Sequence, residues 1–218
     1  TTGNPKAVRH SHNTLARALD NGADAWGLGA ADLMLMPSPV THITGFVNGI
    51  ELPFFTPTRT ALMEQWEVSR AIDLIKSLKA TACLSATPFL QELVQECRTR
   101  GERLPSLRFF ACGGASVPPG LIYDTHRVLE RCRSFRVYGS TEVPLVSVGF
   151  MKPEQECLAA ETDGCIFNWE VRVADDDGNT LPGGQDGEIL VRGPAMMLGY
   201  GDDRQNADAL TADGYFRT

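Results

Sequence analysis

Apolar positions in the first two thirds of the chain follow two different spacings. Short apolar runs such as Leu33–Met36 and Ala82–Leu84 are bounded by turn residues or polar positions, which is typical of buried strands. Between Ser69 and Lys79 the apolar side chains recur every three or four positions, which predicts an amphipathic helix. Strands and helices that alternate in this way predict an α/β fold, with a largely parallel β-sheet covered by helices.

The same patterns place the other expected elements of this region. The helices are Ser11–Asp20, Ile43–Leu52, Thr87–Arg100 and a segment around Leu121–Cys132, and the strands are Leu107–Cys112 and Phe135–Tyr138. We expect Asn21-Gly22 to end the first helix. Thr87, followed by Pro88, is expected to be the N-cap of the helix that runs to Arg100.

The pattern changes after residue 144. Helical spacing fades, and short strands are expected at Val171–Val173 and Glu188–Val191, with Asp-rich and Gly-rich turns between them. We therefore predict an α/β part over residues 1–144 and a β-rich part over 145–218, both belonging to one large domain. The β-rich part is expected to form a small barrel or a sheet.

Composition narrows the class of protein. The 218 residues carry a formal net charge of −7, which argues against a nucleic-acid or anionic-membrane surface but leaves room for a local basic pocket. None of the six cysteines forms a C-x-x-C pair, so buried reduced thiols of a cytoplasmic protein are favoured over disulfides or a metal site. The chain shows no secretory signal and no apolar run long enough to span a bilayer.

The opening stretch, Thr1-Thr2-Gly3-Asn4-Pro5-Lys6, has the composition of a phosphate-binding loop. Glycine lets backbone N–H groups approach a phosphate, the hydroxyls add donors, and Lys6 adds a mobile positive charge. An ordinary surface turn would explain the same residues. The stretch is not the P-loop of the NTPases, because the chain contains no G-x-x-x-x-G-K-[ST] pattern.

A second candidate follows the expected strand that ends at Tyr138, where the sequence continues Gly139-Ser140-Thr141-Glu142. Ligands usually bind at the carboxyl ends of parallel strands. A tyrosine ring can stack on a base, a threonine hydroxyl can bind phosphate, and a glutamate can hold Mg²⁺. A simple turn with a solvated glutamate is the alternative.

Two further segments have small residues or an isolated histidine. Gly113-Gly114-Ala115 follows an expected strand and would let a flat ligand approach the backbone, although a tight turn explains it equally well. His42 is a lone histidine in the stretch PVTHITG. Taken alone, such a histidine is more often a structural residue than a functional one.

The order and spacing of these segments resemble the adenylate-forming superfamily, which includes acyl-CoA and aryl-CoA synthetases, peptide-synthetase adenylation domains and firefly-type luciferases. The opening loop is similar to the second half of the family's phosphate loop, with Ala7 where glycine is usual. Tyr138–Glu142 matches the Tyr-Gly-x-Thr-Glu signature. Gly187-Glu188-Ile189 with Gly199-Tyr200, and then Gly214–Thr218, match two later signatures, so the resemblance covers essentially the whole chain.

The resemblance implies an enzyme that uses ATP and Mg²⁺ to convert a carboxylic acid to an acyl-adenylate and then transfers the acyl group to coenzyme A. It implies that the opening loop contacts the β- and γ-phosphates through Thr1, Thr2, Gly3 and Lys6. The adenine and acyl pocket would be lined by Gly113, Gly114 and Ala115, and Tyr138, beside Gly139, would stack on adenine. Thr141 would bond the α-phosphate, and Glu142 would hold Mg²⁺. Thr141 and Glu142 are thus the expected catalytic residues.

The acyl-binding residues favour one branch of the superfamily. His42 resembles the histidine that lines the acyl pocket, whereas domains that activate α-amino acids usually carry an aspartate in that motif. The other expected pocket walls are Phe46, Val137, Val143 and Pro144. A fatty-acyl- or aryl-CoA ligase is therefore preferred. A peptide-synthetase adenylation domain and a non-catalytic AMP-binding module remain as alternatives.

Several features of the family are missing from the sequence. The ribose-binding aspartate would follow Thr218 by two positions, and the hinge, the C-terminal domain with its catalytic lysine, and the N-terminal subdomain are not present. The resemblance therefore implies the central part of a larger enzyme, which we expect to be inactive by itself. The oligomeric state is left open.

Overall fold

The computed structural model describes residues 5–218, and its largest element is a five-stranded parallel sheet. The strands are β2 (Leu33–Met36), β3 (Arg59–Leu62), β4 (Ala82–Ser85), β5 (Phe109–Cys112) and β6 (Arg133–Arg136), in the order β3-β2-β4-β5-β6. All four neighbouring pairs run parallel. This confirms the α/β fold expected from the sequence.

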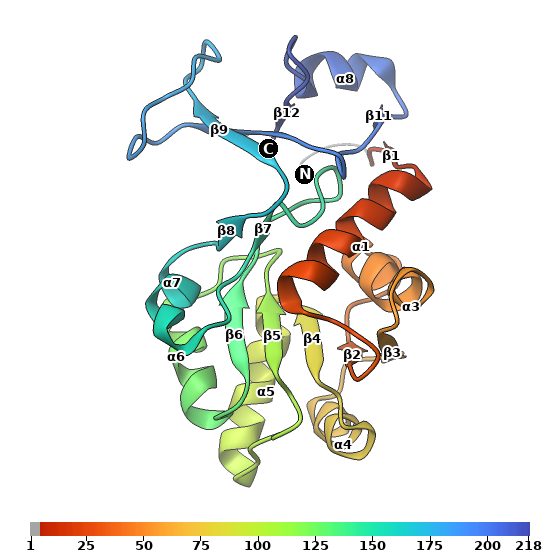
Figure 1. Ribbon diagram of the computed structural model, residues 1–218, viewed down its shortest axis with the longest axis vertical. Coiled ribbons are helices and arrows are strands. Elements are labelled where there is room, and N and C mark those ends of the chain that lie inside the picture. Colours follow the sequence, from red (N-terminus) through yellow and green to blue (C-terminus); the bar gives the residue numbers. More distant parts are fainter. Residues whose placement is uncertain (1–4) are drawn as a thin grey trace.

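Helices cover both faces of this sheet (Figure 1). They are α1 (His12–Trp26), α2 (Ile43–Gly45), the π-helix η1 (Phe46–Glu51), α3 (Leu52–Phe55), α4 (Val68–Leu78), α5 (Thr87–Arg100) and α6 (Pro119–Val128). Trp26 of α1 packs against Phe109 and Phe135 of the sheet, with ring centroids 5.5 and 6.1 Å away. Every residue of β2, β4 and β5 is buried, as expected for strands covered on both sides.

Helix α1 does not end at Asn21-Gly22, so that expectation was wrong. Asn21 is fully buried and its side-chain oxygen accepts a hydrogen bond from Asn168, 3.0 Å away. A side chain at Gly22 would contact Leu145 at 3.2 Å. Both turn-forming residues are thus used for packing against distant segments, and tertiary contacts override the local preference. The helix ends at Gly27, which has the left-handed conformation of a C-cap.

Two boundaries also differ from the expected ones. Ala86 is the N-cap of α5, and Thr87 is already helical, because its hydroxyl donates to the carbonyl of Ser116 rather than capping the helix. Strand β6 ends at Arg136, so Tyr138 lies in the following loop. The helix expected from Ile43 to Leu52 is present, but most of it has π-helical hydrogen bonding.

Most of the elements after residue 144 are short strands, and those expected at Val171–Val173 and Glu188–Val191 are among them. The strands are β7 (Ser147–Val148), β8 (Cys165–Ile166), β9 (Glu170–Ala174), β10 (Glu188–Arg192), β11 (Gly199–Tyr200) and β12 (Phe216–Arg217). β12, β10 and β9 make an antiparallel sheet in that order, and β11 pairs with β1 (Val8–Arg9) near the start of the chain. The 3-10 helix η2 (Pro153–Gln155) and the helices α7 (Glu156–Glu161) and α8 (Asp203–Ala209) also lie here and were not expected. The division at residue 144 stays a prediction.

Buried apolar side chains form two clusters. The larger one fills the space between the parallel sheet and its helices. The smaller one joins α1, the segment after β6 and the later strands, and consists of Ala18, Val143, Val146, Trp169, Val191, Ala195, Met197, Tyr200 and Phe216. Figure 1 shows the part built from β9, β10, β11, β12 and α8 beyond the carboxyl ends of the parallel strands. The smaller cluster therefore lies at the end of the sheet where ligands usually bind.

The cysteines are all free thiols. Cys83, Cys97, Cys112 and Cys132 are buried, whereas Cys157 and Cys165 are exposed. Burial raises the pKa of Cys112 to about 11, so its thiol stays protonated at neutral pH. Within residues 5–218, no helix has the length and apolar character needed to cross a membrane.

Candidate nucleotide site

The segments that leave β5 and β6 lie against each other, as expected for neighbouring parallel strands. The amide of Val137 donates to the carbonyl of Cys112 over 2.9 Å. A Cβ added at Gly113 would lie 2.5 Å from the carbonyl oxygen of Val137, a distance that Cβ atoms essentially never show. Gly113 is thus required by the close approach of two backbones, and this approach brings the Gly113–Ala115 and Tyr138–Glu142 segments together.

The loop from Tyr138 to Val143 is held by its own hydrogen bonds. The hydroxyl oxygen of Ser140 accepts from the amides of Glu142 and Val143, at 3.2 and 3.4 Å. The amide of Tyr138 donates to the hydroxyl oxygen of Ser147 over 2.8 Å. The Tyr138 ring is half-buried against the smaller apolar cluster. The loop therefore has a fixed shape at the carboxyl end of β6.

The Glu142 side chain is bonded to Tyr200. The Tyr200 hydroxyl donates to Oε1 of Glu142 over 2.7 Å, and the amide of Met197 donates to the Glu142 carbonyl over 2.8 Å. Burial, followed by the contact with Glu142, raises the pKa of Tyr200, so its hydroxyl remains a proton donor at neutral pH. The described residues make no hydrogen bond to the second carboxylate oxygen, Oε2.

Residues 6–10 also lie beside Tyr200 and the Thr141–Glu142 loop. Lys6 lies over the Tyr200 ring, with its ammonium nitrogen 5.0 Å from the ring centroid. Strand β1 pairs with β11, with Val8 opposite Tyr200. Nε2 of His10 donates to the carbonyl oxygen of Thr141 over 2.7 Å, because a carbonyl can only accept. Three segments that are far apart in the sequence thus meet at Thr141 and Glu142.

The remaining predicted site residues have less direct connections. Thr1, Thr2 and Gly3 lie outside the described residues. His42 is exposed, and its Nδ1 accepts the amide of Thr44 as the N-cap of α2. Phe46 is 39% exposed in η1. These two side chains follow β2, which is separated from β5 by β4, and among the described residues no hydrogen bond links them to Glu142.

Four of the other predicted residues, which also lie in the segments after β5 and β6, differ in exposure. Gly114, Ala115 and Gly139 are exposed, and Val137 is half-buried. Val143 has no exposed surface and packs in the smaller apolar cluster, and Pro144 is buried as well. As the structure stands, Val143 supports the loop from behind and offers no surface to a ligand.

The sequence did not indicate the partners of Thr141 and Glu142. Gly199-Tyr200 is recognisable in the sequence as a motif, but the motif gives no role to the Tyr200 hydroxyl. His10 lies in none of the motifs. The only available signal was the spacing of the Gly-Tyr motif, since nothing local to these residues shows which distant group each one contacts.

The residues around Glu142 fit a magnesium ion that is held mainly by phosphate oxygens. Mg²⁺ usually takes one or two protein carboxylates, while substrate phosphates and water complete its coordination. The described residues contain no group of three His, Cys, Asp or Glu side chains able to hold a metal alone. Glu142 provides one carboxylate oxygen bonded to Tyr200 and a second without such a bond, which suits this kind of site.

A parallel sheet with this loop after its edge strand, β6, is the arrangement with which α/β enzymes bind ligands at the carboxyl ends of their strands. The chain belongs to the AMP-binding enzyme family, whose pattern matches residues 1–201. It is 32% identical to the medium-chain fatty-acid–CoA ligase of Escherichia coli over 99% of the chain, and 29% identical to the indoleacetate–CoA ligase of Aromatoleum aromaticum over all of it.

The fold is similar to that of solved enzymes of this kind. The structure of a long-chain-fatty-acid–CoA ligase from Archaeoglobus fulgidus matches with a TM-score of 0.87 and 26% identity, over 100% of this chain and 47% of that one. The chain spans 38% of the length of the Escherichia coli ligase and 42% of the Aromatoleum ligase. The activity of a whole enzyme is therefore a matter of proposal for this chain.

Proposed function

We propose that this chain supplies the nucleotide- and acid-binding part of an AMP-forming carboxylate–CoA ligase. Such an enzyme joins a carboxylic acid to AMP with release of pyrophosphate, and then forms an acyl-CoA thioester. The observation that carries the proposal is the meeting of Lys6, the Thr141–Glu142 loop and Tyr200 at the carboxyl end of β6. A loop lysine, a threonine hydroxyl and a carboxylate together suit a polyphosphate with its metal ion.

Each group has a distinct part in the proposed site. Attack of a carboxylate on a triphosphate brings two anions together, so positive charge and fixed donors are needed. Mg²⁺ held by Glu142 would neutralise the phosphates. Thr141 would bond the α-phosphate, and Lys6 would contact the β- and γ-phosphates together with Thr1, Thr2 and Gly3. Tyr138 would stack on adenine beside Gly113, Gly114, Ala115 and Gly139.

The proposed substrate class rests on the residues expected to line the acid-binding pocket. We assign the acid to the space bordered by His42, Phe46 and Val137, with Val143 behind it. These side chains include no carboxylate to pair with an α-ammonium group. The matched ligases are named for a fatty acid and for indoleacetate. A fatty or aryl acid is thus preferred over an amino acid, and the enzyme would work in the cytoplasm, in fatty-acid metabolism if the acid is aliphatic.

The first experiment measures nucleotide binding by the chain itself. Calorimetry with AMP should show binding in the millimolar range or tighter, because the adenine and α-phosphate contacts proposed here lie within residues 113–142. A matched chain with Thr141→Val should bind AMP more weakly, by about tenfold for the loss of one hydrogen bond to a charged group. A folded chain that gives no heat with AMP would contradict the proposal.

The second experiment identifies the acid. ATP–pyrophosphate exchange should be measured with the enzyme that carries this sequence, over a panel of fatty, aryl and amino acids. We expect exchange with a fatty or aryl acid. Selective exchange with an amino acid would instead assign the protein to peptide-synthetase adenylation domains. AMP binding without exchange on any acid would favour a non-catalytic binding module.

A further inference from the structure

We propose that Tyr200 is a positioning residue that orients the Glu142 carboxylate for the metal ion, an inference that rests on the proposed function. Tyr200 lies 58 positions along the chain from Glu142, and its hydroxyl reaches Oε1 at 2.7 Å. A carboxylate on a half-buried loop can rotate about its side-chain bonds. A bond from a fixed phenol to one oxygen removes that freedom and presents the other oxygen, Oε2, to a ligand.

Tyr200 can act in this way because its own backbone is fixed. The Asn206 side chain accepts a hydrogen bond from the amide of Tyr200 over 2.6 Å and lies 3.5 Å from its carbonyl. Tyr200 is only 3% exposed. Its neighbour Gly199 has φ of +129°, and a Cβ there would lie 3.0 Å from the same Asn206 side chain. Asn206 therefore holds the backbone of the Gly-Tyr pair in place.

The backbone around Glu142 is held by the same strand. The amide of Met197 donates to the Glu142 carbonyl, and the amides of Leu198 and Gly201 donate to Arg9 and Ala7 at the start of the chain. Segment 197–201 thus fixes Glu142 through both its backbone and its side chain, and it also anchors the base of the loop that carries Lys6. Tyr200 thus contacts both Lys6, through its ring, and Glu142, through its hydroxyl. Lys6 is proposed to bind the phosphates, and Glu142 is proposed to bind their metal ion.

The test compares Tyr200→Phe with the natural chain by calorimetry. ATP affinity is measured with and without Mg²⁺, and AMP affinity without Mg²⁺. Removing the hydroxyl leaves the ring under Lys6 but frees the carboxylate. We expect the Mg²⁺-dependent gain in ATP affinity to fall by about tenfold, as for loss of one hydrogen bond to a charged group. AMP affinity without Mg²⁺ should stay within about twofold, because that binding does not use the metal.

Tyr215→Phe is the matched control. Its hydroxyl also contacts a glutamate, Glu170 of β9, and among the described residues no hydrogen bond links this pair to Glu142. It should leave both affinities unchanged. Equal loss of both affinities in Tyr200→Phe would show a merely structural role, and no loss would show that the hydroxyl does not act; either result overturns the inference. If Tyr200→Phe does not fold, Asn206→Ala serves instead, with the same selective loss expected.

A measurement without ligand separates this inference from the proposed function. With ¹³C-labelled glutamate, the carboxyl signal of Glu142 should shift in Tyr200→Phe and stay in place in Tyr215→Phe. If the natural chain binds no ATP, the proposed function fails, whereas the carboxyl signal still decides whether Tyr200 positions Glu142. An unchanged signal overturns the positioning role.

Discussion

The hydrogen bond between Tyr200 and Glu142 affects the pKa of the Tyr200 hydroxyl. Burial and the neighbouring carboxylate raise the pKa of Tyr200, because both disfavour the phenolate. Replacing Glu142 with glutamine removes the negative charge and keeps the shape. We predict that Glu142→Gln lowers the pKa of Tyr200, as measured by ultraviolet titration of the tyrosines.

Glu170→Gln is the control for this titration, since Glu170 contacts the Tyr215 hydroxyl instead. It should leave the ionisation of Tyr200 where it is in the natural chain. An unchanged Tyr200 titration in Glu142→Gln would show that the two groups are not bonded in solution.

Gly113 allows a prediction about the backbone at the site. Gly113→Ala would place a Cβ 2.5 Å from the carbonyl oxygen of Val137, so one of the two loops has to move. We expect the free energy of unfolding to fall by about 1–3 kcal/mol, the usual range for overpacking. Urea denaturation measures this change.

The matched control is Gly120→Ala in α6, where an added Cβ has no neighbour within 4 Å. Alanine is a better helix former than glycine, so this variant should be as stable as the natural chain or more stable by about 0.5–1 kcal/mol. Equal destabilisation by both substitutions would argue against the close approach at Gly113.

The sequence predicted the position of Thr141 and Glu142 in the fold better than it predicted the contacts that hold them. Thr141 and Glu142 were found from one local motif, and the structure places them at the carboxyl end of β6 as expected. Their bonds to His10 and Tyr200 join residues more than fifty positions apart. Such contacts form only in the completed fold, so local patterns in one sequence do not predict them.

At the scale of single elements, α1 has a complete capping box. Ser11 accepts the amide of Thr14 over 3.2 Å, and Thr14 accepts the amide of Ser11 over 3.0 Å. We predict that Ser11→Ala lowers the free energy of unfolding by about 1 kcal/mol, because an amide at the helix start loses its acceptor. Thermal or urea denaturation gives the value.

A second serine in a helix provides the comparison. The exposed Ser77 hydroxyl donates back to the carbonyl of Asp73 within α4, a bond that adds little to helix stability. Ser77→Ala should therefore change the stability by only a few tenths of a kcal/mol. If Ser11→Ala changed the free energy of unfolding as little as Ser77→Ala, the capping box would not contribute to the stability of α1.

Elements with a strong apolar pattern were predicted well, and those set by distant contacts were not. The strands at Leu33–Met36 and Ala82–Ser85 and the helix α4 follow from local spacing. The continuation of α1 through Asn21-Gly22 depends on Asn168 and Leu145, far away in the sequence. The π-helical hydrogen bonding of η1 likewise left no recognisable mark in the pattern of apolar residues.

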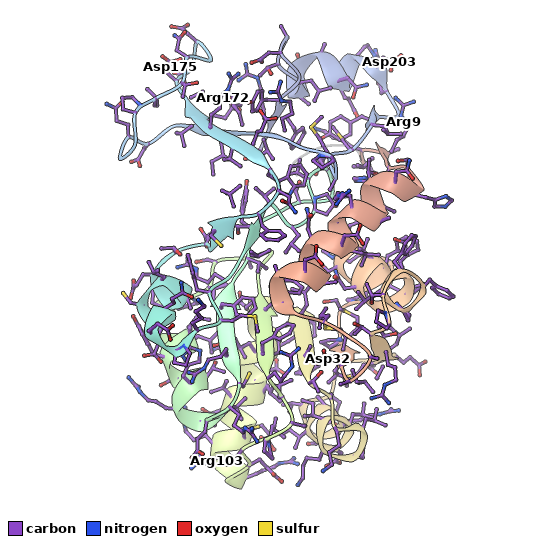
Figure 2. The ribbon with its side chains drawn as sticks, in the orientation of Figure 1. Arg9, Asp32, Arg103, Arg172, Asp175 and Asp203 are labelled. Carbon is purple, nitrogen blue, oxygen red and sulfur yellow. The ribbon has the colours of Figure 1, made fainter. Side chains whose placement is uncertain are left out.

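At the scale of the whole molecule, Asp32 ties several segments together at the end of the sheet opposite to the candidate site (Figure 2). Its carboxylate accepts hydrogen bonds from Thr81 at 2.7 Å, from Arg108 at 2.9 Å and from the amide of Gly29 at 3.0 Å. Thr81 precedes β4 and Arg108 precedes β5, so one buried carboxylate connects the starts of three strands.

This network predicts a dependence of stability on pH. Burial raises the pKa of Asp32, but the bonds from Thr81, Arg108 and Gly29 outweigh it and hold the pKa below its ordinary value of 3.8. The stabilisation is therefore present above that value and is lost as the pH falls through the lowered pKa. We predict that Asp32→Asn costs about 1–3 kcal/mol at pH 7.

Urea denaturation at a series of pH values checks this prediction. The difference between Asp32→Asn and the natural chain should shrink as the pH is lowered below about 4. The exposed Asp73→Asn provides the control and should cost almost nothing at any pH. A difference that stays constant with pH would mean that the charge of Asp32 is not what stabilises the fold.

We expect the pairing of Val8 with Tyr200 to form late in folding. It closes a loop that contains the whole parallel sheet, and the entropic cost of closing a loop grows with its length. The sheet has only local βαβ steps to complete and can form first. We therefore expect the carboxylate, the lysine and the tyrosine to meet late in folding, so that a partly folded chain has its sheet but does not yet bind nucleotide.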